Sequence, residues 1–277
     1  MTTIPVFIAW ILFSPSPTQA DEALIRAVVA KSYLGGMYIG RDLDSLRRGF
    51  HERFRMAVFW QGEFSERDRE TWIQKFTSYP APDKEKAASY RWNIPTVLVA
   101  GFAAAARIEI YQHNQLKYTD FFTFYRFPEG WRVLEKTFHY HPNERENEYD
   151  LDSDRKAIES LIDDAYIGGH LTGHDPKALR KGFHERFRMI VWHNGELDIR
   201  DREAWIGRVM SHPAPTPEAA ASWRWQIPVI ELAGDAGLAQ IEVYKRDHHI
   251  FTDFLTFYRF PEGWRAVGKI FNYAPEP

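Results

Sequence analysis

The sequence places two carboxylates and a tyrosine where they could transfer protons. Glu109 and Tyr111 stand two positions apart, a spacing that puts both side chains on one face of a β-strand. Asp120 follows on the next predicted strand. A carboxylate in an apolar cavity has a raised pKa and could abstract a proton next to a carbonyl group, while a tyrosine could donate to the oxyanion. The alternative is a cross-strand ion pair, such as Glu109 with Arg55 or Lys136.

A histidine and several aromatic and arginine side chains are further candidates. His51 precedes a predicted strand and could act as a general acid or base, or could cap or pack against that strand. Trp72 and the pair Arg91 and Trp92 could stack on a flat ligand ring and bind its polar edge, or could pack in a core or interface. Every candidate has an identical counterpart 133 positions later, and this second set is His184, Trp205, Arg224, Trp225, Glu242, Tyr244 and Asp253.

These candidates recur because the chain is duplicated. The segment FYRFPEGWR begins at Phe124 and again at Phe257, and GFHERFRM begins at Gly49 and again at Gly182. The same offset relates the two halves without a gap from residue 21 onward. A period of this length indicates a copied domain and not a solenoid repeat. We therefore predict domains over residues 21–142 and 154–277, joined by an acidic linker over residues 143–153.

Each half reads as helices followed by strands. Apolar residues at helical spacing and Asp42 as a helix N-cap predict the helices, and alternating apolar residues predict the strands. The order predicts an α+β fold, with about three N-terminal helices packed on one face of a curved antiparallel sheet. A cone-shaped domain of this kind leaves a cavity between sheet and helices. The predicted helices span 21–39, 42–49 and 67–77, and the predicted strands span 53–60, 92–100, 106–112, 118–127 and 131–140.

Three sequence features carry a resemblance to a known family. They are a Tyr-x-x-Gly helix end followed by Gly and Asp, a Phe-His-x-x-x-x-Met segment, and a T-D-F-x-T-F-Y hairpin that ends in Gly-Trp-Arg and a Lys-x-Phe pair. They make each half similar to the nuclear-transport-factor-2-like (NTF2-like) superfamily, and more narrowly to its Putative lumazine-binding, SnoaL-like branch. In the first half the residues are Tyr33, Gly36, Gly40, Asp42, Phe50, His51, Met56, Lys136 and Phe138; in the second they are Tyr166, Gly169, Gly173, Asp175, Phe183, His184, Met189, Lys269 and Phe271.

The resemblance implies a cone-shaped α+β fold but leaves several functions open. The superfamily includes isomerases, dehydratases, polyketide cyclases, epoxide hydrolases and non-catalytic binding or dimerisation modules. Such folds often pair through the outer face of the sheet, so the two copies are expected to form an internal pseudo-dimer.

The composition narrows the possible partners. The 277 residues are 44% hydrophobic and 16% aromatic, which indicates a large core or an aromatic-lined pocket. The net charge of −3 gives no basic field, so we expect no nucleic-acid partner. The absence of cysteine excludes disulfides and thiolate chemistry.

Metal and cofactor signatures are also missing from the sequence. His139 and His141 are replaced in the second half by Asn272 and Ala274, and no other histidine pair has a third ligand. No phosphate-binding or nucleophile-elbow motif is present. We expect neither a metal nor a cofactor.

The first 20 residues resemble a signal peptide. A ten-residue apolar run over residues 4–13 is too short to cross a bilayer and is followed by SPSP and by TQA before Asp21. No Lys or Arg precedes the run. We expect export to the periplasm or the extracellular space, and a cytoplasmic protein if the run is instead a first strand. The rest of the sequence has no other long apolar run, so we expect no membrane span in the mature chain.

The sequence favours a non-catalytic role. We expect the protein to bind a small apolar or aromatic molecule or to serve as an assembly module. The alternative is an isomerase-, dehydratase- or cyclase-type enzyme that uses one of the carboxylates or histidines named above.

Overall fold

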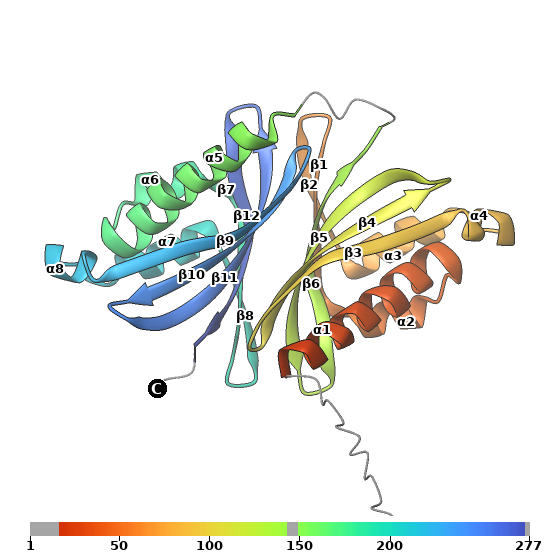
Figure 1. Cartoon of the computed structure of the whole chain (residues 1–277), viewed down its shortest axis with the longest axis horizontal. Coiled ribbons are helices and arrows are strands. Elements are labelled where there is room, and N and C mark those ends of the chain that lie inside the picture. The colour runs from red at the N-terminus through yellow and green to blue at the C-terminus, as the bar shows by residue number, and fades with distance from the viewer. Residues whose placement is uncertain (1–16, 143–148, 275–277) are drawn as a thin grey trace, which may run out of the picture.

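The structure is a computed structural model that describes residues 17–142 and 149–274, and it contains two units of the same plan (Figure 1). The predicted signal peptide lies outside the described residues up to residue 16, as does the linker over residues 143–148. Within the described ranges, none of the helices is long and apolar enough to cross a membrane.

In the first unit most helices precede the strands, as predicted. Its helical segments are α1 (Pro17–Val28), the π-helical η1 (Val29–Ile39), α2 (Leu43–Gly49), α3 (Arg69–Thr77) and α4 (Lys84–Ala88). Its strands are β1 (Phe50–Trp60), β2 (Glu63–Asp68), β3 (Tyr90–Ala100), β4 (Ala103–Gln112), β5 (Gln115–Phe127) and β6 (Gly130–Tyr140).

The second unit repeats this order. Its helical segments are α5 (Leu151–Leu161), the π-helical η3 (Ile162–Thr172), α6 (Pro176–Gly182), α7 (Arg202–Met210) and α8 (Pro217–Ala220). Its strands are β7 (Phe183–His193), β8 (Glu196–Asp201), β9 (Trp223–Ala233), β10 (Ala236–Lys245), β11 (His248–Phe260) and β12 (Gly263–Tyr273). The predicted α+β class and tandem duplication are confirmed.

Each sheet is mixed, which corrects the prediction of an antiparallel sheet. The strand order is β2-β1-β6-β5-β4-β3 in the first unit and β8-β7-β12-β11-β10-β9 in the second. Every pair is antiparallel except β1 with β6 and β7 with β12. The sequence pattern identifies a strand but not its neighbour, so a parallel pairing between segments distant in the chain could not be predicted.

Several of the helices begin at a short polar side chain that caps them. Asp42 accepts a hydrogen bond from the Ser45 N–H at the start of α2, as predicted, and Asp175 caps α6 in the same way. The short elements β2 and α4 were missed because their residues are mostly charged and exposed, so they show little apolar periodicity.

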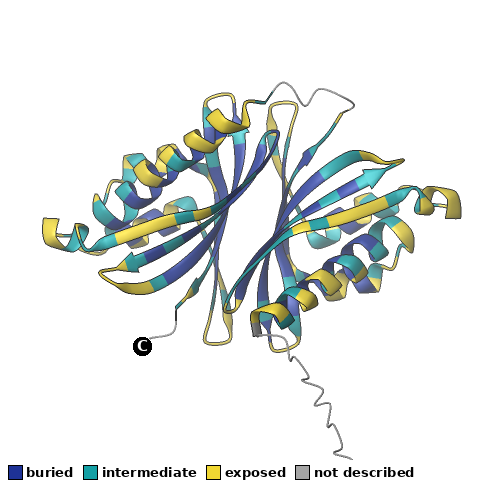
Figure 2. Ribbon diagram, viewed as in Figure 1, coloured by how far each residue is buried: buried dark blue, intermediate teal, exposed yellow. Residues whose placement is uncertain are grey.

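Buried apolar residues lie on both faces of each sheet. The helices pack on one face, and an apolar cluster fills the space beneath them in each unit. The opposite faces of the two sheets lie toward each other in the middle of the molecule (Figure 1). A third apolar cluster, which includes Phe121, Tyr125, Phe254 and Tyr258, contains residues of both sheets. Figure 2 accordingly shows buried segments along the central strands and exposed ones at the turns and on the outer helices.

Candidate functional site

A buried tyrosine, aspartate and lysine form a hydrogen-bonded group inside the second unit. The Tyr166 O–H donates to Asp253 Oδ2 at 2.6 Å, and Lys269 Nζ donates to the Tyr166 hydroxyl at 2.5 Å. Lys269 Nζ also forms an ion pair with Asp253 Oδ1 at 2.6 Å. The lysine ammonium lies over the ring of Tyr166, 4.3 Å from its centroid. We call Tyr166, Asp253 and Lys269 the second-unit triad.

Three distant elements bring the triad together. Tyr166 projects from the π-helical η3, Asp253 from the middle strand β11 and Lys269 from β12. The β11–β12 register pairs Asp253 with Phe271 and Leu255 with Lys269, so the two charged side chains emerge two residues apart on the helix-covered face. The triad therefore ties the π-helical η3 to the centre of the sheet.

Burial and mutual contact set the charges of this group. Desolvation raises the pKa of Asp253 above its usual range and lowers that of Lys269, although each partner stabilises the charge of the other. Desolvation and the nearby Asp253 carboxylate raise the pKa of Tyr166 well above its usual value, so this phenol keeps its proton.

A cavity of about 260 Å³ lies next to the triad. Tyr166 and Lys269 form part of its wall, whereas Asp253 is not one of its lining residues. Aromatic rings line much of the cavity, contributed by Trp205, Phe251, Phe271 and Tyr273. The remaining lining residues are His170, Met189, Arg200, Arg208, Val209 and His212.

Positive charge dominates the lining. Arg200 and Arg208 join Lys269 in the wall, and no Asp or Glu is among the lining residues that the structure describes. Arg200 forms an ion pair with Asp198 at 2.5 Å, but no ion pair joins Arg208 to any residue in ranges 17–142 and 149–274.

His170 contributes a neutral ring to the cavity. Burial, together with the Lys269 charge, lowers the pKa of His170 to about 3. Its Nδ1 atom is buried and has no hydrogen-bond partner within the described chain. The ring lies against Trp205, with centroids 5.5 Å apart. A neutral imidazole offers one N–H donor and one acceptor, so His170 is suited to the polar edge of a ligand.

The first unit keeps the triad but changes its surroundings. Tyr33 donates to Asp120 Oδ2 at 2.7 Å, and Lys136 Nζ lies 2.7 Å from the Tyr33 hydroxyl and 2.5 Å from Asp120 Oδ1. Tyr38 adds its own hydroxyl, 3.3 Å from that of Tyr33. At the positions of His170, Leu171 and Val209 of the second unit, the first unit carries Met37, Tyr38 and Phe76.

Among the residues predicted from the sequence, the two aspartates and two tryptophans lie on the helix-covered side of the sheets. Asp120 and Asp253 are fully buried in the triads, and Trp72 and Trp205 are buried core residues. Of these four, only Trp205 lines the described cavity. In the second unit, therefore, Trp205 lines the cavity, whereas Asp253 is buried next to it without lining it.

Glu109 and Tyr111 face the opposite side of the sheet. The β4–β5 register pairs Ile108 with Asp120 and Glu109 with Thr119, so Glu109 and Asp120 point to different faces. Glu109 accepts a hydrogen bond from the Tyr111 hydroxyl at 2.9 Å. It also pairs with Arg107 at 2.9 Å, and not with the predicted partners Arg55 or Lys136. The proton-transfer group predicted from these residues is therefore not assembled.

Glu242 and Tyr244 repeat this arrangement in the second unit. Tyr244 donates to Glu242 Oε2 at 2.7 Å, and Gln226 and Gln240 donate to the same carboxylate. These hydrogen bonds lower the pKa of Glu242 against the opposing effect of its partial burial.

Replacing Glu242 should not affect a ligand in the cavity. Because Glu242 is not a lining residue, we expect Glu242→Gln to change the dissociation constant of a bound molecule less than two-fold, measured by isothermal titration calorimetry. Glu109→Gln is the matched variant of the first unit and should behave the same way. A ten-fold loss of affinity in Glu242→Gln would show that the site lies on the other face of the sheet.

His51 and His184 support the first strand of each unit. His51 Nδ1 accepts the Arg53 N–H at 3.0 Å, and its ring stacks on Phe127. His184 makes the corresponding contacts with Arg186 and Phe260. Desolvation lowers the pKa of both histidines. His184 is not among the lining residues of the cavity.

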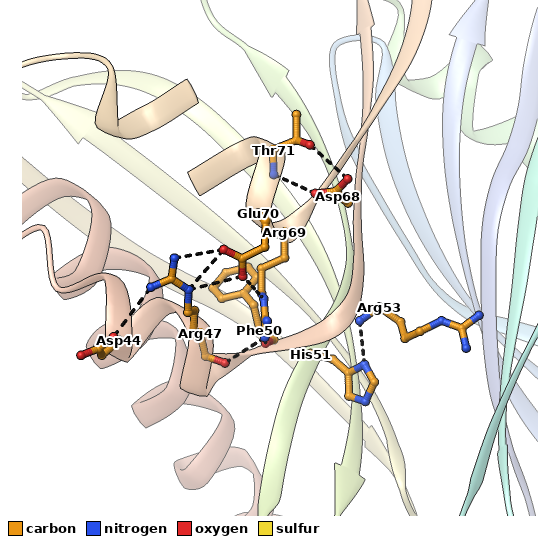
Figure 3. Close-up of polar contacts among 9 residues, drawn as sticks. All are labelled: Asp44, Arg47, Phe50, His51, Arg53, Asp68, Arg69, Glu70 and Thr71. Atoms are coloured by element: carbon orange, nitrogen blue, oxygen red, sulfur yellow. Dashed lines mark hydrogen bonds and ion pairs between the residues drawn. The ribbon is translucent and has the colours of Figure 1, made fainter. Parts of the chain in front are cut away.

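Figure 3 shows His51 apart from a neighbouring ion-pair network that positions α3. In that network Glu70 on α3 accepts from Arg47 on α2 and from Arg69. Arg69 also donates to the Phe50 carbonyl, which fixes the start of β1. The second unit repeats these contacts through Arg180, Glu203 and Arg202.

Arg91, Trp92 and their counterparts lie on exposed edge strands. Trp92 and Trp225 are both 38% exposed, on β3 and β9. Trp225 Nε1 donates to Asp163 on η3 at 2.7 Å, and Arg224 pairs with Asp247. Neither Arg224 nor Trp225 lines the cavity.

The sequence did not identify Tyr166, Lys269 and His170 as site residues. Tyr166 and Lys269 carry a usable signal, because both recur 133 positions away and Lys269 is a charged residue next to the apolar Ile270 and Phe271. His170 could be noticed only as a difference between the copies, because the first unit has Met37 at this position. Within the described residues, no group of three or more His, Asp or Glu side chains could hold a metal ion.

Comparisons with known proteins match each unit separately. A family described as "Putative lumazine-binding" matches residues 20–139 and 153–272. Among solved structures, an NTF2-like protein of unknown function from Silicibacter pomeroyi DSS-3 is 24% identical, with 46% of this chain and 100% of that chain covered and a TM-score of 0.39.

Two further structures cover a similar share of the chain. An NTF2-like protein of unknown function from Shewanella baltica OS155 is 20% identical, covering 46% of this chain and 99% of that one, with a TM-score of 0.40. A cystatin-like fold protein from Burkholderia xenovorans LB400 is 16% identical over 47% of this chain and 97% of that one, with a TM-score of 0.36. A search of curated proteins found no match.

Proposed function

Because the chain belongs to the Putative lumazine-binding family in both of its halves, we propose that it binds a small molecule in the cavity of its second unit. The observation that carries this proposal is the cavity of about 260 Å³ walled by Trp205, Phe251, Phe271 and Tyr273 beside the triad. A concave site with aromatic walls and a few polar groups is the usual form of a small-molecule site.

The lining favours an aromatic ligand with an acidic group. Lys269, Arg200 and Arg208 supply positive charge, and the described lining supplies no carboxylate to repel an anion. Arg208 has no ion-pair partner in the described ranges, so its charge is available to a ligand. Guanidinium groups bind carboxylates in a fork geometry, and aromatic walls pack against a flat ring.

The second unit is better suited to a ligand than the first. In the first unit Phe76 stands in place of Val209 and Met37 in place of His170. An aromatic ring thus replaces a small aliphatic group, and a thioether replaces an imidazole. Tyr38 replaces Leu171 and directs its hydroxyl to the first-unit triad. We infer that both copies keep the triad and that the second copy carries the ligand site.

Matched titrations test this proposal. We expect 2-naphthoate to bind with one site per chain and at least ten-fold more tightly than its neutral isostere 2-naphthamide, as measured by isothermal titration calorimetry. Benzoate with benzamide, and cinnamate with cinnamamide, extend the comparison to smaller rings. Equal affinity of the acid and the amide within every pair would contradict the proposal that the ligand carries an acidic group. If none of the six compounds binds, the proposal that the ligand is aromatic is contradicted.

An acid–base enzyme is the second candidate function. It is favoured by one observation, which is that Lys269 and Tyr166 reach the cavity wall and that burial lowers the pKa of the lysine. Asp253 is less suited to the role of base, because both its oxygens are engaged and it does not line the cavity. Deuterium incorporation into a bound ligand in heavy water would reveal proton abstraction, and we expect none.

We also propose that the two units form an internal pseudo-dimer. The Tyr125 hydroxyl of the first unit donates to the Ile190 carbonyl, and the Tyr258 hydroxyl donates to the Ala57 carbonyl, which is the same contact with the units exchanged. Reciprocity of this kind is the mark of a two-fold interface. Small-angle scattering should show one compact particle, whereas two independently moving domains would contradict the pairing.

Export is a separate proposal that the N-terminal sequence supports. The apolar run over residues 4–13 and the TQA segment before Asp21 have the plan of a signal peptide. Helix α1 begins at Pro17, so cleavage after Ala20 would leave most of this helix in place. Intact-mass measurement of the protein from its own cells should give a chain that begins at Asp21, and a chain that retains residues 1–20 would contradict export by this route.

A further inference from the structure

One buried carboxylate breaks the symmetry between the two sheets. Glu135 on β6 is fully buried and belongs to the first unit. The residue 133 positions later is Gly268 on β12. A Cβ atom added to Gly268 would overlap the Oε2 atom of Glu135. The Glu135 side chain therefore occupies the space next to Gly268, which has no side chain of its own.

The two positions face each other although they are equivalent in the repeat. In a two-fold pair, a residue that meets its own counterpart lies on the symmetry axis. Positions 135 and 268 thus lie at the pseudo-two-fold axis of the proposed pairing, on which this inference rests. In a pair of identical units, the same residue would have to face itself here.

Glu135 has its ion-pair partner within the first unit. Glu135 forms an ion pair with Arg55, which is also joined to Glu66 at 2.6 Å. The same guanidinium crosses to the second unit, where it donates to the Val267 and Arg186 carbonyls, each at 2.8 Å. The first unit therefore brings two carboxylates to one arginine at the interface.

The second unit lacks both carboxylates around the matching arginine. Arg188 stands at the position of Arg55 and donates to the Arg53 carbonyl at 2.6 Å. Gly268 and Ile199 occupy the positions of Glu135 and Glu66. The strand registers are otherwise the same, because Arg55 pairs with Glu135 and Arg188 pairs with Gly268.

We propose that Glu135 and Gly268 form a complementary pair that lets the sheet face of the first unit accept the second unit but exclude another copy of the first. Two first units placed face to face would bring two Glu135 carboxylates together in a buried site, where repulsion and desolvation both oppose charge. Two second units would set glycine against glycine, leaving a gap and two arginines without carboxylates. The partner that fits the first face is thus the second unit.

Exchange of the two residues in the full chain tests this inference. Gly268→Glu recreates the forbidden contact and should lower the thermal unfolding midpoint by about 10 °C. Glu135→Gly should lower it less, because Arg55 keeps Glu66. The double variant with both changes should recover more than half of the loss caused by Gly268→Glu, because the introduced glutamate would then face the introduced glycine and lie beside Arg188.

The pH dependence separates charge from steric effects. Facing carboxylates have raised pKa values in the folded state, so the deficit of Gly268→Glu should grow as the pH rises from 5 to 8. Gly268→Ala adds only a methyl group, and its deficit should not depend on pH. Gly207→Glu is the control for an added charge, because its Cβ would meet open space on helix α7, and it should not lower the midpoint.

Each outcome decides the proposal. Additive losses in the double variant would overturn it, even if the pairing itself is correct. No loss in Gly268→Glu would overturn both the inference and the pairing. If Gly268→Glu fails to accumulate as folded protein, the double variant decides: folding supports complementarity, and failure to fold overturns it.

Discussion

Replacing Lys269 with Met should lower the free energy of unfolding by about 3–5 kcal/mol, the effect expected when one partner of a buried ion pair is removed. Asp253 is fully buried and would keep only the Tyr166 hydrogen bond. Without the ammonium, its pKa in the folded state rises further above the unfolded value of about 3.9. A raised pKa of this kind costs stability as the pH rises, so the deficit should be larger at pH 7 than at pH 5.

A second variant separates the ion pair from the volume of the side chain. Lys269→Met combined with Asp253→Asn leaves a neutral group that can still accept the Tyr166 hydrogen bond, and it should recover much of the lost stability. Urea unfolding followed by circular dichroism measures both effects. Lys136→Met is the corresponding variant of the first unit. A loss below 1 kcal/mol at pH 7 in Lys269→Met would show that the triad does not hold helix and sheet together.

Replacing Val209 with Phe should weaken ligand binding at least ten-fold while leaving the fold intact. Phenylalanine is the residue at this position in the first unit, where Phe76 occupies the equivalent place on the helix. In the second unit the larger ring would enter the cavity, which Val209 lines. We expect at least a ten-fold rise in the dissociation constant of 2-naphthoate, equivalent to about 1.4 kcal/mol or more.

The reciprocal change is the matched control. Phe76→Val removes a ring from the first unit and should leave the affinity of the second-unit site unchanged. Calorimetry on both variants, together with their unfolding curves, distinguishes a filled cavity from a damaged fold. Binding that survives Val209→Phe would place the ligand elsewhere, and binding lost in Phe76→Val would assign it to the first unit.

Much of the fold could be predicted because the sequence contains the same domain twice. The common offset identified the domains, and apolar periodicity with caps such as Asp42 located most helices and strands. Strand neighbours could not be predicted in the same way. The parallel pairing of β1 with β6 depends on contacts between segments some 80 residues apart, such as Arg55 with Glu135.

The site was harder to predict because it depends on register. Alternation along one strand correctly places Glu109 and Tyr111 together, as their 2.9 Å hydrogen bond shows. It does not say which face of β4 matches which face of β5, and the pairing of Glu109 with Thr119 separates it from Asp120. Asp120 is instead joined to Tyr33, a residue 87 positions earlier, and no local pattern reports that contact.

Agreement between the copies and disagreement between them carry different information. Tyr33, Asp120 and Lys136 are kept in the second unit, and the structure gives both sets the same buried geometry. His170 differs from Met37 and is found at the cavity. Identical residues include both scaffold and cavity wall, as Trp205 and its counterpart Trp72 show, so only the differing residues distinguish the two units.

Native mass spectrometry of the protein purified from its own cells would detect a bound ligand directly. We expect a single bound small molecule per chain, which carries an aromatic ring and an acidic group. The mass increment should be missing from Val209→Phe and present in Phe76→Val. A chain with no bound molecule in any preparation, with two equivalents, or with an increment that persists in Val209→Phe would contradict a ligand site in the second unit.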